Sequence, residues 1–271
     1  MTRRIGSATA ELQQLAGLVT NRTKRHQLGL ALVEGVRPVA MALDHGWRFQ
    51  TVVTAERRRL SDWAASVVAR VGEAHHVVVV EPLMRLLTDR EELPELVGVV
   101  ATPATSLDDI GVHDRVLVVV LDRPASPGNL GTVVRTADAF GADAVVLSGH
   151  AADPWDPKAV RASTGSVFAL PVVVVESVAA AVPLLDRCRT AGARVVGADE
   201  TGPVDLDRAA LDGPLVVVLG NEARGLGRRW RSVCDELVRV PMRGSASSLN
   251  VAAAAAAVLY EADRQRRAAG R

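Results

Sequence analysis

Three short segments of the sequence bring glycine together with amide, guanidinium, carboxylate and hydroxyl side chains. They read RPASPGNLGTVVRTA, LGNEARGLG and PMRGSASSLN in chain order. A guanidinium binds phosphate and stabilises a developing negative charge, and glycine lets the backbone approach a ligand closely. The segments therefore predict a site that binds a polar substrate. Its candidate side chains are Asn129, Arg135, Glu222, Ser248 and Asn250.

These residues also have local structural interpretations. Asn129 and Ser248 are residue types expected at helix N-caps, which would put Gly131 and Asn250 in the first turns. Glu222, directly after an apolar run, is compatible with a solvated turn. Arg135 is explained less well in this way, because the residues around it are apolar and expected to be buried.

The three segments adjoin apolar runs that predict a parallel sheet. The runs are continuous rather than alternating, as in strands that are covered on both faces. They lie at 116–121, 144–149, 172–175, 193–198, 215–220 and 237–241. Helices are expected between them and at the end, at 131–140, 159–166, 178–191 and 248–267. Ligands bind such sheets outside the carboxyl ends of the strands, where the polar residues of the segments cluster.

The chain before this sheet predicts a smaller α/β domain. Helical patterns cover 8–18, 37–45 and 61–71, strands are expected at 31–33, 51–54 and 76–80, and a polar basic turn at 21–27. A stretch rich in Pro, Thr, Ser and Asp then separates the two parts. We expect domains at residues 1–105 and 106–271.

Composition and missing motifs exclude several classes of protein. An apolar share of 48% over 271 residues indicates a folded chain. The apolar stretch Val251 to Tyr260 is far shorter than the roughly 20 residues of a membrane helix, and no secretion signal is visible, so a cytoplasmic protein is expected. Cys188 and Cys234 form no CxxC pair, which predicts no thiolate metal site. The sequence lacks dinucleotide-binding, P-loop and G-x-S-x-G motifs.

The three segments carry a family resemblance. They match N-x-x-G-x-x-x-R-T-A at 129–137, L-G-N-E-x-x-G-L at 219–226 and P-M-x-G-x-x-x-S-L-N at 241–250. In this order they resemble the motifs of the SpoU, or TrmH-type, RNA ribose methyltransferases of the SPOUT superfamily. RPASPGNLG and SGHAADPWDPKAVRASTGSVFALP are especially similar to the avilamycin-resistance branch, which acts on 23S rRNA. The sequence departs from the family at 126–128, where Ser-Pro-Gly replaces the common Asp-Pro.

The resemblance implies an enzyme that transfers a methyl group from S-adenosylmethionine to a ribose 2′-hydroxyl of 23S rRNA. It implies a trefoil knot in the C-terminal SPOUT domain, a small N-terminal substrate-binding domain like ribosomal protein L30e, and a homodimer whose active sites combine both subunits. No metal is implied. The cofactor pocket would be lined by Ala198, Gly220, Val240, Met242 and Leu249.

The resemblance also assigns roles within the catalytic set Asn129, Arg135, Glu222, Ser248 and Asn250. Arg135 would hold the target phosphate and stabilise the forming alkoxide. Glu222 would orient Arg135 or neighbouring groups, and Ser248 and Asn250 would position the loop and the ribose. The identity of the general base stays open, because a guanidinium is effectively always protonated.

The formal charge of +1 hides an uneven distribution that gains meaning from this resemblance. Residues 1–60 hold ten Lys and Arg against four Asp and Glu, a local +6, and residues 61–110 hold three against nine, a local −6. Either a coding bias toward arginine or an RNA-binding face accounts for the basic segment. An RNA-binding face would use Arg22, Lys24, Arg25, Arg37 and Arg57 to Arg59.

Other functions remain open at this point. The same reaction on tRNA and a non-catalytic RNA-binding module on the same fold are both compatible with the resemblance. The second is less favoured, because a binding module would be free to lose the motif residues. A small-molecule enzyme of Rossmann type would need the dinucleotide fingerprint that the sequence lacks.

Overall fold

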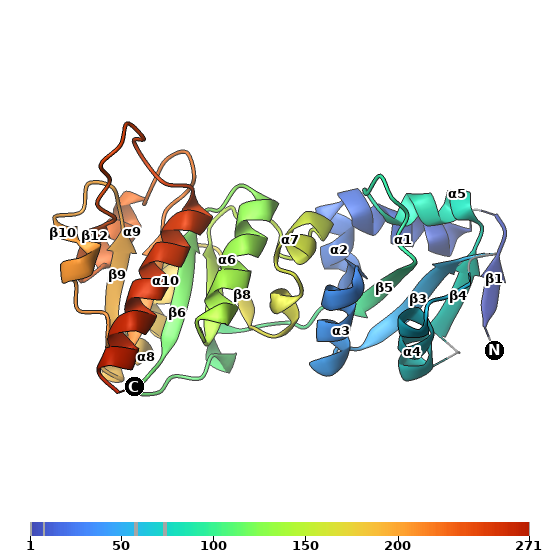
Figure 1. Cartoon of the computed structure of the whole chain (residues 1–271), viewed down its shortest axis with the longest axis horizontal. Helices are drawn as coiled ribbons and strands as arrows, with labels where there is room; N and C mark the ends of the chain where they lie inside the picture. The colour runs from blue at the N-terminus through green and yellow to red at the C-terminus, as the bar shows by residue number, and fades with distance from the viewer. Residues whose placement is uncertain (1, 8, 57–58, 73–74, 271) are drawn as a thin grey trace. The chain divides into compact units, whose positions relative to one another are not determined.

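The computed structural model describes residues 2–7, 9–56, 59–72 and 75–270, and the chain forms two compact units. Unit 1 comprises Met1–Ala104 and Asp153–Ala169, and unit 2 comprises Thr105–Ala152 and Leu170–Arg271. The segment Asp153–Ala169 therefore belongs to unit 1, although a single division near residue 106 assigns it to the second domain. Each unit has its own sheet and its own core (Figure 1).

Unit 1 is built on a mixed sheet with the strand order β1-β4-β3-β5-β2. Its strands are β1 (Arg3–Ile5), β2 (Leu30–Glu34), β3 (Phe49–Ala55), β4 (His76–Val79) and β5 (Leu96–Ala101). Its helices are α1 (Ala10–Thr20), α2 (Arg22–Leu28), α3 (Val36–Asp44), α4 (Asp62–Val71), α5 (Glu81–Met84) and α7 (Pro157–Ala162), with 3-10 turns at Arg85–Leu87 and Ser166–Phe168. β5 runs antiparallel to both of its neighbours, whereas β1, β4 and β3 are mutually parallel.

The basic turn expected at 21–27 is instead the helix α2. The Asn21 side chain caps its start by accepting a hydrogen bond from the Lys24 N–H at 3.0 Å. Gly29 ends it in the left-handed conformation, at φ 61°. The prediction of a turn was wrong because the polar composition of this segment outweighed the two capping signals at its ends.

The segment Asp153–Ala169 is joined to the rest of unit 1 by ion pairs and aromatic contacts. Arg25 is buried and donates from Nε to Asp153 Oδ2 at 2.7 Å, while its Nη2 pairs with Asp156 at 3.3 Å. Trp47 donates its indole N–H to the Phe168 carbonyl at 2.8 Å, and their rings meet edge to face. These contacts explain why the segment forms part of unit 1.

Unit 2 is built on a parallel sheet with the order β10-β12-β9-β11-β6-β7-β8, which confirms the predicted fold class. Its strands are β6 (Leu117–Asp122), β7 (Ala144–Ser148), β8 (Val172–Val175), β9 (Arg194–Ala198), β10 (Val204–Asp205), β11 (Leu215–Leu219) and β12 (Glu236–Arg239). Its helices are α6 (Pro127–Ala139), α8 (Val178–Thr190), α9 (Arg228–Val233) and α10 (Val251–Ala268), with 3-10 turns at Leu107–Asp109 and Leu206–Arg208.

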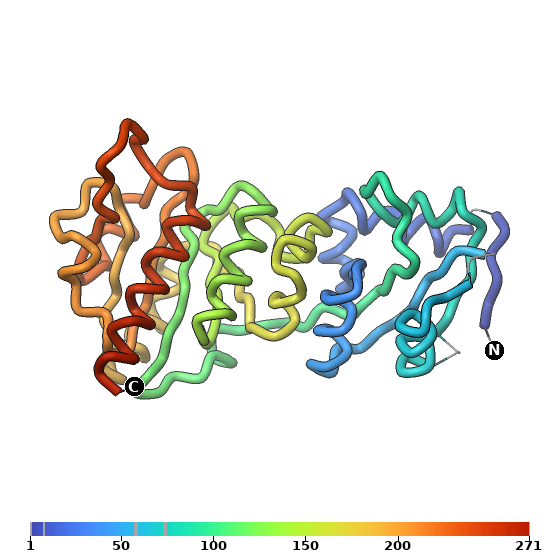
Figure 2. Tube along the Cα trace, viewed as in Figure 1, coloured from blue at the N-terminus to red at the C-terminus, as the bar shows by residue number. Residues whose placement is uncertain are grey.

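Helices cover both faces of this sheet, as its continuous apolar strands require. α6 and α10 lie side by side on one face (Figure 1). α8 and α9 contact the strands from the other face, where Trp230 and Leu184 join the buried core. The tube in Figure 2 shows the chain leaving β12 for a long excursion before it enters α10. Across the described residues, no helix is long and apolar enough to cross a membrane.

Candidate active site

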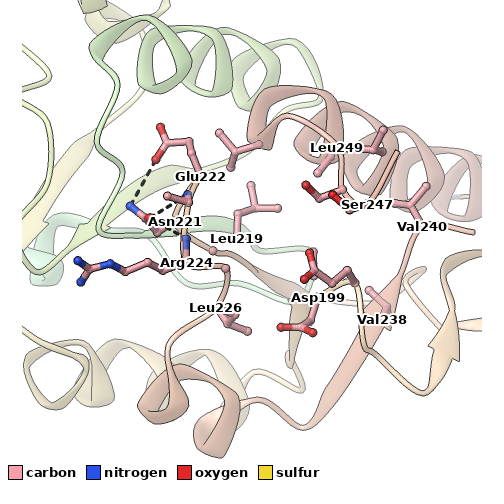
Figure 3. Close-up of a pocket in the computed structure, with 18 of the residues that line it drawn as sticks. Asp199, Leu219, Asn221, Glu222, Arg224, Leu226, Val238, Val240, Ser247 and Leu249 are labelled. Atoms are coloured by element: carbon pink, nitrogen blue, oxygen red, sulfur yellow. Dashed lines mark hydrogen bonds between the residues drawn. The ribbon is translucent and has the colours of Figure 1, made fainter. Parts of the chain in front are cut away.

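A cleft of about 380 Å³ opens in unit 2 where β9, β11 and β12 end. This volume falls within the roughly 300–1,000 Å³ of typical small-molecule pockets. Its wall is made by the residues that follow these strands and by the first turn of α10 (Figure 3). The five residues predicted to line a cofactor pocket all lie on this wall: Ala198, Gly220, Val240, Met242 and Leu249.

Gly220 lets the backbone of one loop in the cleft wall fold back tightly on itself. A Cβ atom at this position would lie 2.4 Å from the backbone of Gly225 and Leu226, closer than real contacts allow. Residues 221–225 form a tight loop closed by two backbone hydrogen bonds between Asn221 and Gly225, with Gly225 at φ +62°. The loop therefore requires glycine at both positions.

Glu222 joins this loop to the start of α6. Its carboxylate accepts the backbone N–H groups of Ala125 and Ser126 at 3.0 and 3.1 Å. It also accepts the Asn129 side-chain amide at 3.2 Å. Burial raises the pKa of Glu222, but the hydrogen bonds from Ala125, its own backbone, Asn129 and Ser126 outweigh it and lower the pKa below the ordinary value of 4.5. Glu222 is therefore an ionised anchor at neutral pH and a weak base.

Asn250 extends the same network to the third motif. Its side-chain amide donates to Asn129 Oδ1 at 3.2 Å, and its own Oδ1 caps α10 by accepting the Ala252 N–H. A chain of hydrogen bonds therefore runs from Glu222 through Asn129 to Asn250. It connects three segments that are far apart in the sequence, and we call these three residues the junction network.

The structure corrects both predicted helix caps. Ser126, rather than Asn129, caps α6, because Pro127 occupies the first helical position and Ser126 Oγ accepts the Asn129 N–H at 3.3 Å. Asn250, rather than Ser248, caps α10. Asn129 is thereby free to use its side chain within the junction network.

Ser248 and Arg135 lie outside the junction network. Ser248 is exposed on the wall of the cleft. Arg135 is exposed on α6 while Val133, Val134 and Ala137 are buried, as expected. Six residues separate it from Asn129, so the two side chains point about 120° apart around the helix. The partners of the Glu222 carboxylate among the described residues do not include Arg135, so within this chain Glu222 orients Asn129 instead.

Comparison with known proteins gives this arrangement a family. The sequence pattern of the SpoU rRNA Methylase family matches residues 116–260, and that of the SpoU L30e-like domain matches residues 9–98. A 23S rRNA (uridine(2479)-2'-O)-methyltransferase from Streptomyces viridochromogenes is 46% identical over 97% of this chain and 93% of its own. The chain belongs to the SpoU rRNA methylase family.

Solved structures of family members have the same fold. The SpoU methyltransferase AviRb from Streptomyces viridochromogenes, in complex with the cofactor AdoMet, superposes with a TM-score of 0.91 at 44% identity, over 96% of this chain and 99% of its own. An AdoMet-bound rRNA methyltransferase from Sinorhizobium meliloti superposes with a TM-score of 0.86 at 31% identity, over 97% and 98%.

The candidate set predicted from the sequence did not include two residues of the site, Asn221 and Asp199. Asn221 holds the loop of the second motif by donating to the Arg123 carbonyl at 2.6 Å, and Arg123 has a left-handed backbone with φ 51°. Asp199, next to the predicted Ala198, lies on the cleft wall and pairs with Arg231 of α9. The second family motif contains Asn221 and could have identified it. No sequence signal identifies Asp199, because its pairing with Arg231 depends on the tertiary fold.

The predicted RNA-binding residues of unit 1 divide by exposure. Arg37 is exposed, and Arg22 and Lys24 are half-buried. Arg25 must be withdrawn from the set, because it is 2% exposed and pairs with Asp153 and Asp156. Arg57 and Arg58 lie outside the described residues, and Arg59 is exposed.

Proposed function

We propose that this chain is an S-adenosylmethionine-dependent RNA 2′-O-ribose methyltransferase that acts on 23S rRNA. The observation that carries the proposal is the junction network, which draws all three family motifs together beside a cleft of suitable size. The 46% identity to a 23S rRNA 2'-O-methyltransferase over nearly the full chain supports the substrate class.

The lining of the cleft fits S-adenosylmethionine. Leu219, Leu226 and Val238 offer apolar contacts for an adenine ring. Residues 241–249 form no hydrogen bond with any other described residue. Their backbone polar groups are therefore available to a ligand, as expected for a pocket that works largely through backbone contacts. When bound, the cofactor supplies a methyl group already activated on its sulfonium.

The chemical step needs alignment and charge stabilisation. The cofactor would supply the methyl group to the ribose 2′-oxygen and leave as a neutral thioether, and the hydroxyl proton would pass to water or to a phosphate oxygen. Arg135 would stabilise the oxygen as it gains negative charge. Glu222 is poorly suited to accept the proton, because its pKa is lowered and its oxygens already accept hydrogen bonds. We assign Glu222, Asn129 and Asn250 to positioning, and Ser248 to contact with the ribose.

We further propose that the enzyme is a homodimer and that Arg135 of the partner subunit completes each site. The position of Arg135 supports this assignment, because it is exposed and turned away from Asn129 of its own chain. Exposed apolar side chains at Met242, Leu249 and Tyr260 offer surface for the contact. Mixing the Arg135→Ala and Asn129→Ala variants should restore part of the activity that each has lost, whereas a site made by one chain would stay inactive.

The two parts of the chain would share the work. We propose that unit 1 binds RNA, with Arg22, Lys24 and Arg37 among the contacts, and that unit 2 forms the methyltransferase domain with its knot. The knot is what the resemblance to the SPOUT methyltransferases implies. A ribosomal substrate would make the cytoplasm the site of action.

The test is methyl transfer to defined RNAs. The purified protein is incubated with labelled S-adenosylmethionine and either 23S rRNA or tRNA, and the modified ribose is mapped. We expect incorporation into 23S rRNA at one 2′-hydroxyl. Incorporation into tRNA alone would favour the other substrate, and binding of RNA without incorporation would favour a binding module.

Similarity to the avilamycin-resistance branch leads us to propose that the modification protects ribosomes from an antibiotic. Expression of the chain in a sensitive host should raise the inhibitory concentration of avilamycin. Expression of the Arg135→Ala variant should leave it unchanged, since that variant would lack methyl transfer.

A further inference from the structure

The described arginines of unit 2 differ in their partners. Arg266 donates to backbone carbonyls. Eight of the sixteen pair with a carboxylate: Arg123, Arg187, Arg189, Arg194, Arg231, Arg239, Arg264 and Arg267. Among the described residues, those whose side chains form neither an ion pair nor a hydrogen bond are exposed: Arg115, Arg135, Arg208, Arg224, Arg228, Arg229 and Arg243. The exposed group is not spread evenly over the unit.

Four of the exposed arginines stand on the segments that build the cleft, and we call them the rim arginines: Arg224, Arg228, Arg229 and Arg243. Arg224 lines the cleft, and its side chain points away from the other labelled residues (Figure 3). Arg243 directly follows the lining residue Met242. Arg228 and Arg229 begin α9, three and two residues before the lining residue Arg231.

The acidic residues on the same segments do not neutralise this charge. Glu222 is held by the backbone of Ala125 and Ser126. Asp235 pairs with Arg189, and Glu236 pairs with Arg194. The exposed Glu200 also lines the cleft, between Asp199 and Thr201, which both contact Arg231 of α9, and it offsets at most one of the four positive charges. The rim therefore carries uncompensated positive charge at neutral pH.

We propose that the rim arginines bind the backbone phosphates of the RNA strand on either side of the target nucleotide. The proposal rests on the proposed function, because a ribose that enters the cleft must bring its neighbouring phosphates past the rim. A guanidinium suits this task, since its planar fork binds phosphate oxygens and stays charged. Phosphate contacts fix the register of a strand without reading its sequence.

The chain offers a matched control for the charge itself. Arg115 and Arg208 are exposed and unpaired within the described residues, as Arg228 and Arg229 are, but they stand outside the segments that supply the cleft wall, whereas α9 contributes Arg231 to it. Arg115 precedes β6 and so lies at the amino edge of the parallel sheet, opposite the cleft. The double variant Arg228→Ala with Arg229→Ala therefore removes as much positive charge as Arg115→Ala with Arg208→Ala. The two variants differ only in where on unit 2 the charge is removed.

The experiment measures the affinity of each full-length variant for transcribed 23S rRNA over a series of salt concentrations. The rim double variant should bind more weakly than wild type, and the slope of log affinity against log salt should fall by about 1 to 1.5, since each phosphate contact to a single strand contributes about 0.7. The Arg115, Arg208 variant should match wild type. Affinity for S-adenosylmethionine should be the same in all three proteins, which verifies that each is folded.

Two results would overturn the proposal: equal affinity and slope in wild type and the rim variant, or equal losses in the rim variant and its control. Failure of the proposed function has a different signature. A wild-type protein that binds 23S rRNA but transfers no methyl group would contradict the proposed function, while the rim variant would still report on RNA binding.

Discussion

Two sets of arginines in this protein differ in whether carboxylates neutralise their charge. In unit 1, Arg25 is buried between Asp153 and Asp156, and Arg161 lies between Glu34 and Asp89. In unit 2, the rim arginines are exposed and lack carboxylate partners among the described residues. The first set holds a segment in place within its own unit, whereas the second leaves its charge available to a ligand.

The contrast shows that the net charge of a sequence segment does not identify a surface that binds nucleic acid. Arg25 belongs to the most basic stretch of the sequence, yet the fold neutralises it. The rim arginines occur in the part of the chain whose charges balance, yet they stay uncompensated because neighbouring acids are used elsewhere. The partner of a charge therefore decides its role more than the composition around it.

The largest effect is expected from an exposed arginine outside both sets. The Arg135→Ala variant should lose methyl transfer by a factor on the order of 10³ or more, because the charge that develops on the ribose oxygen would go unstabilised. Its affinity for S-adenosylmethionine should stay close to wild type. The Arg115→Ala variant, which removes the same charge at the far edge of the sheet, is the control. Equal turnover in a folded Arg135→Ala variant would remove Arg135 from the mechanism.

Arg25 tests the buried side of the comparison. The Arg25→Ala variant should lower the free energy of unfolding of unit 1 by about 3–5 kcal/mol, because it leaves Asp153 buried without its partner. Urea unfolding followed by tryptophan fluorescence reports mainly on this unit, which holds three of the four tryptophans, Trp47, Trp63 and Trp155. The exposed Arg37 provides the control, and Arg37→Ala should change stability by less than about 0.5 kcal/mol. Similar free energies of unfolding for the two variants would contradict a stabilising role of the ion pairs of Arg25.

Glu222 tests whether the junction network positions the site. The Glu222→Gln variant should lower kcat/KM by about tenfold, because hydrogen bonds to a charged acceptor contribute roughly 1.5–3 kcal/mol and this carboxylate is partly exposed. Its folded-state pKa is lowered, so its stabilising contribution is complete above the ordinary pKa of 4.5 and is lost as the pH falls through the lowered value. The free energy of unfolding of the Glu222→Gln variant should therefore fall less steeply at acid pH than that of wild type. An identical fall in both proteins would contradict the assignment.

The smallest effect is expected from the remaining basic residues of unit 1. Replacing Lys24 and Arg37 with alanine should weaken binding to 23S rRNA a few fold, with a salt slope lower by about 1. Binding of S-adenosylmethionine should not change. If RNA affinity were unaffected, the excess of arginine in residues 1–60 would reflect coding bias.

The sequence predicted the parallel sheet of unit 2 well, because buried strands such as Val172–Val175 are continuous apolar runs. It also brought together the residues of the cleft wall, through the family motifs. It misplaced the starts of α6 and α10, since Pro127 and the capping by Asn250 shift each boundary by a few residues. The strand β5 was not expected, because its β-branched run adjoins the Pro- and Thr-rich stretch taken as a linker.

What remained hidden depends on contacts that are distant in sequence. Arg25 meets Asp153 across 128 residues, so no local pattern reveals that its charge is neutralised. The hydrogen bond between Asn129 and Asn250 spans 121 residues and likewise depends on the tertiary fold. The motifs identified these asparagines as important, but only the structure gives them a shared task.

The place of Asp153–Ala169 in unit 1 has a consequence for how the chain can be divided. A fragment that ends at Ala104 would retain Arg25 and Trp47 but lose their partners Asp153, Asp156 and Phe168. The buried Arg25 would then lack its ion pairs, and Trp47 would lack its hydrogen bond. The complementary fragment would carry a segment without its binding surface. Cutting the gene between the two family patterns would therefore produce two incomplete proteins, and exchange of the N-terminal unit between relatives would need to carry both pieces of unit 1 together.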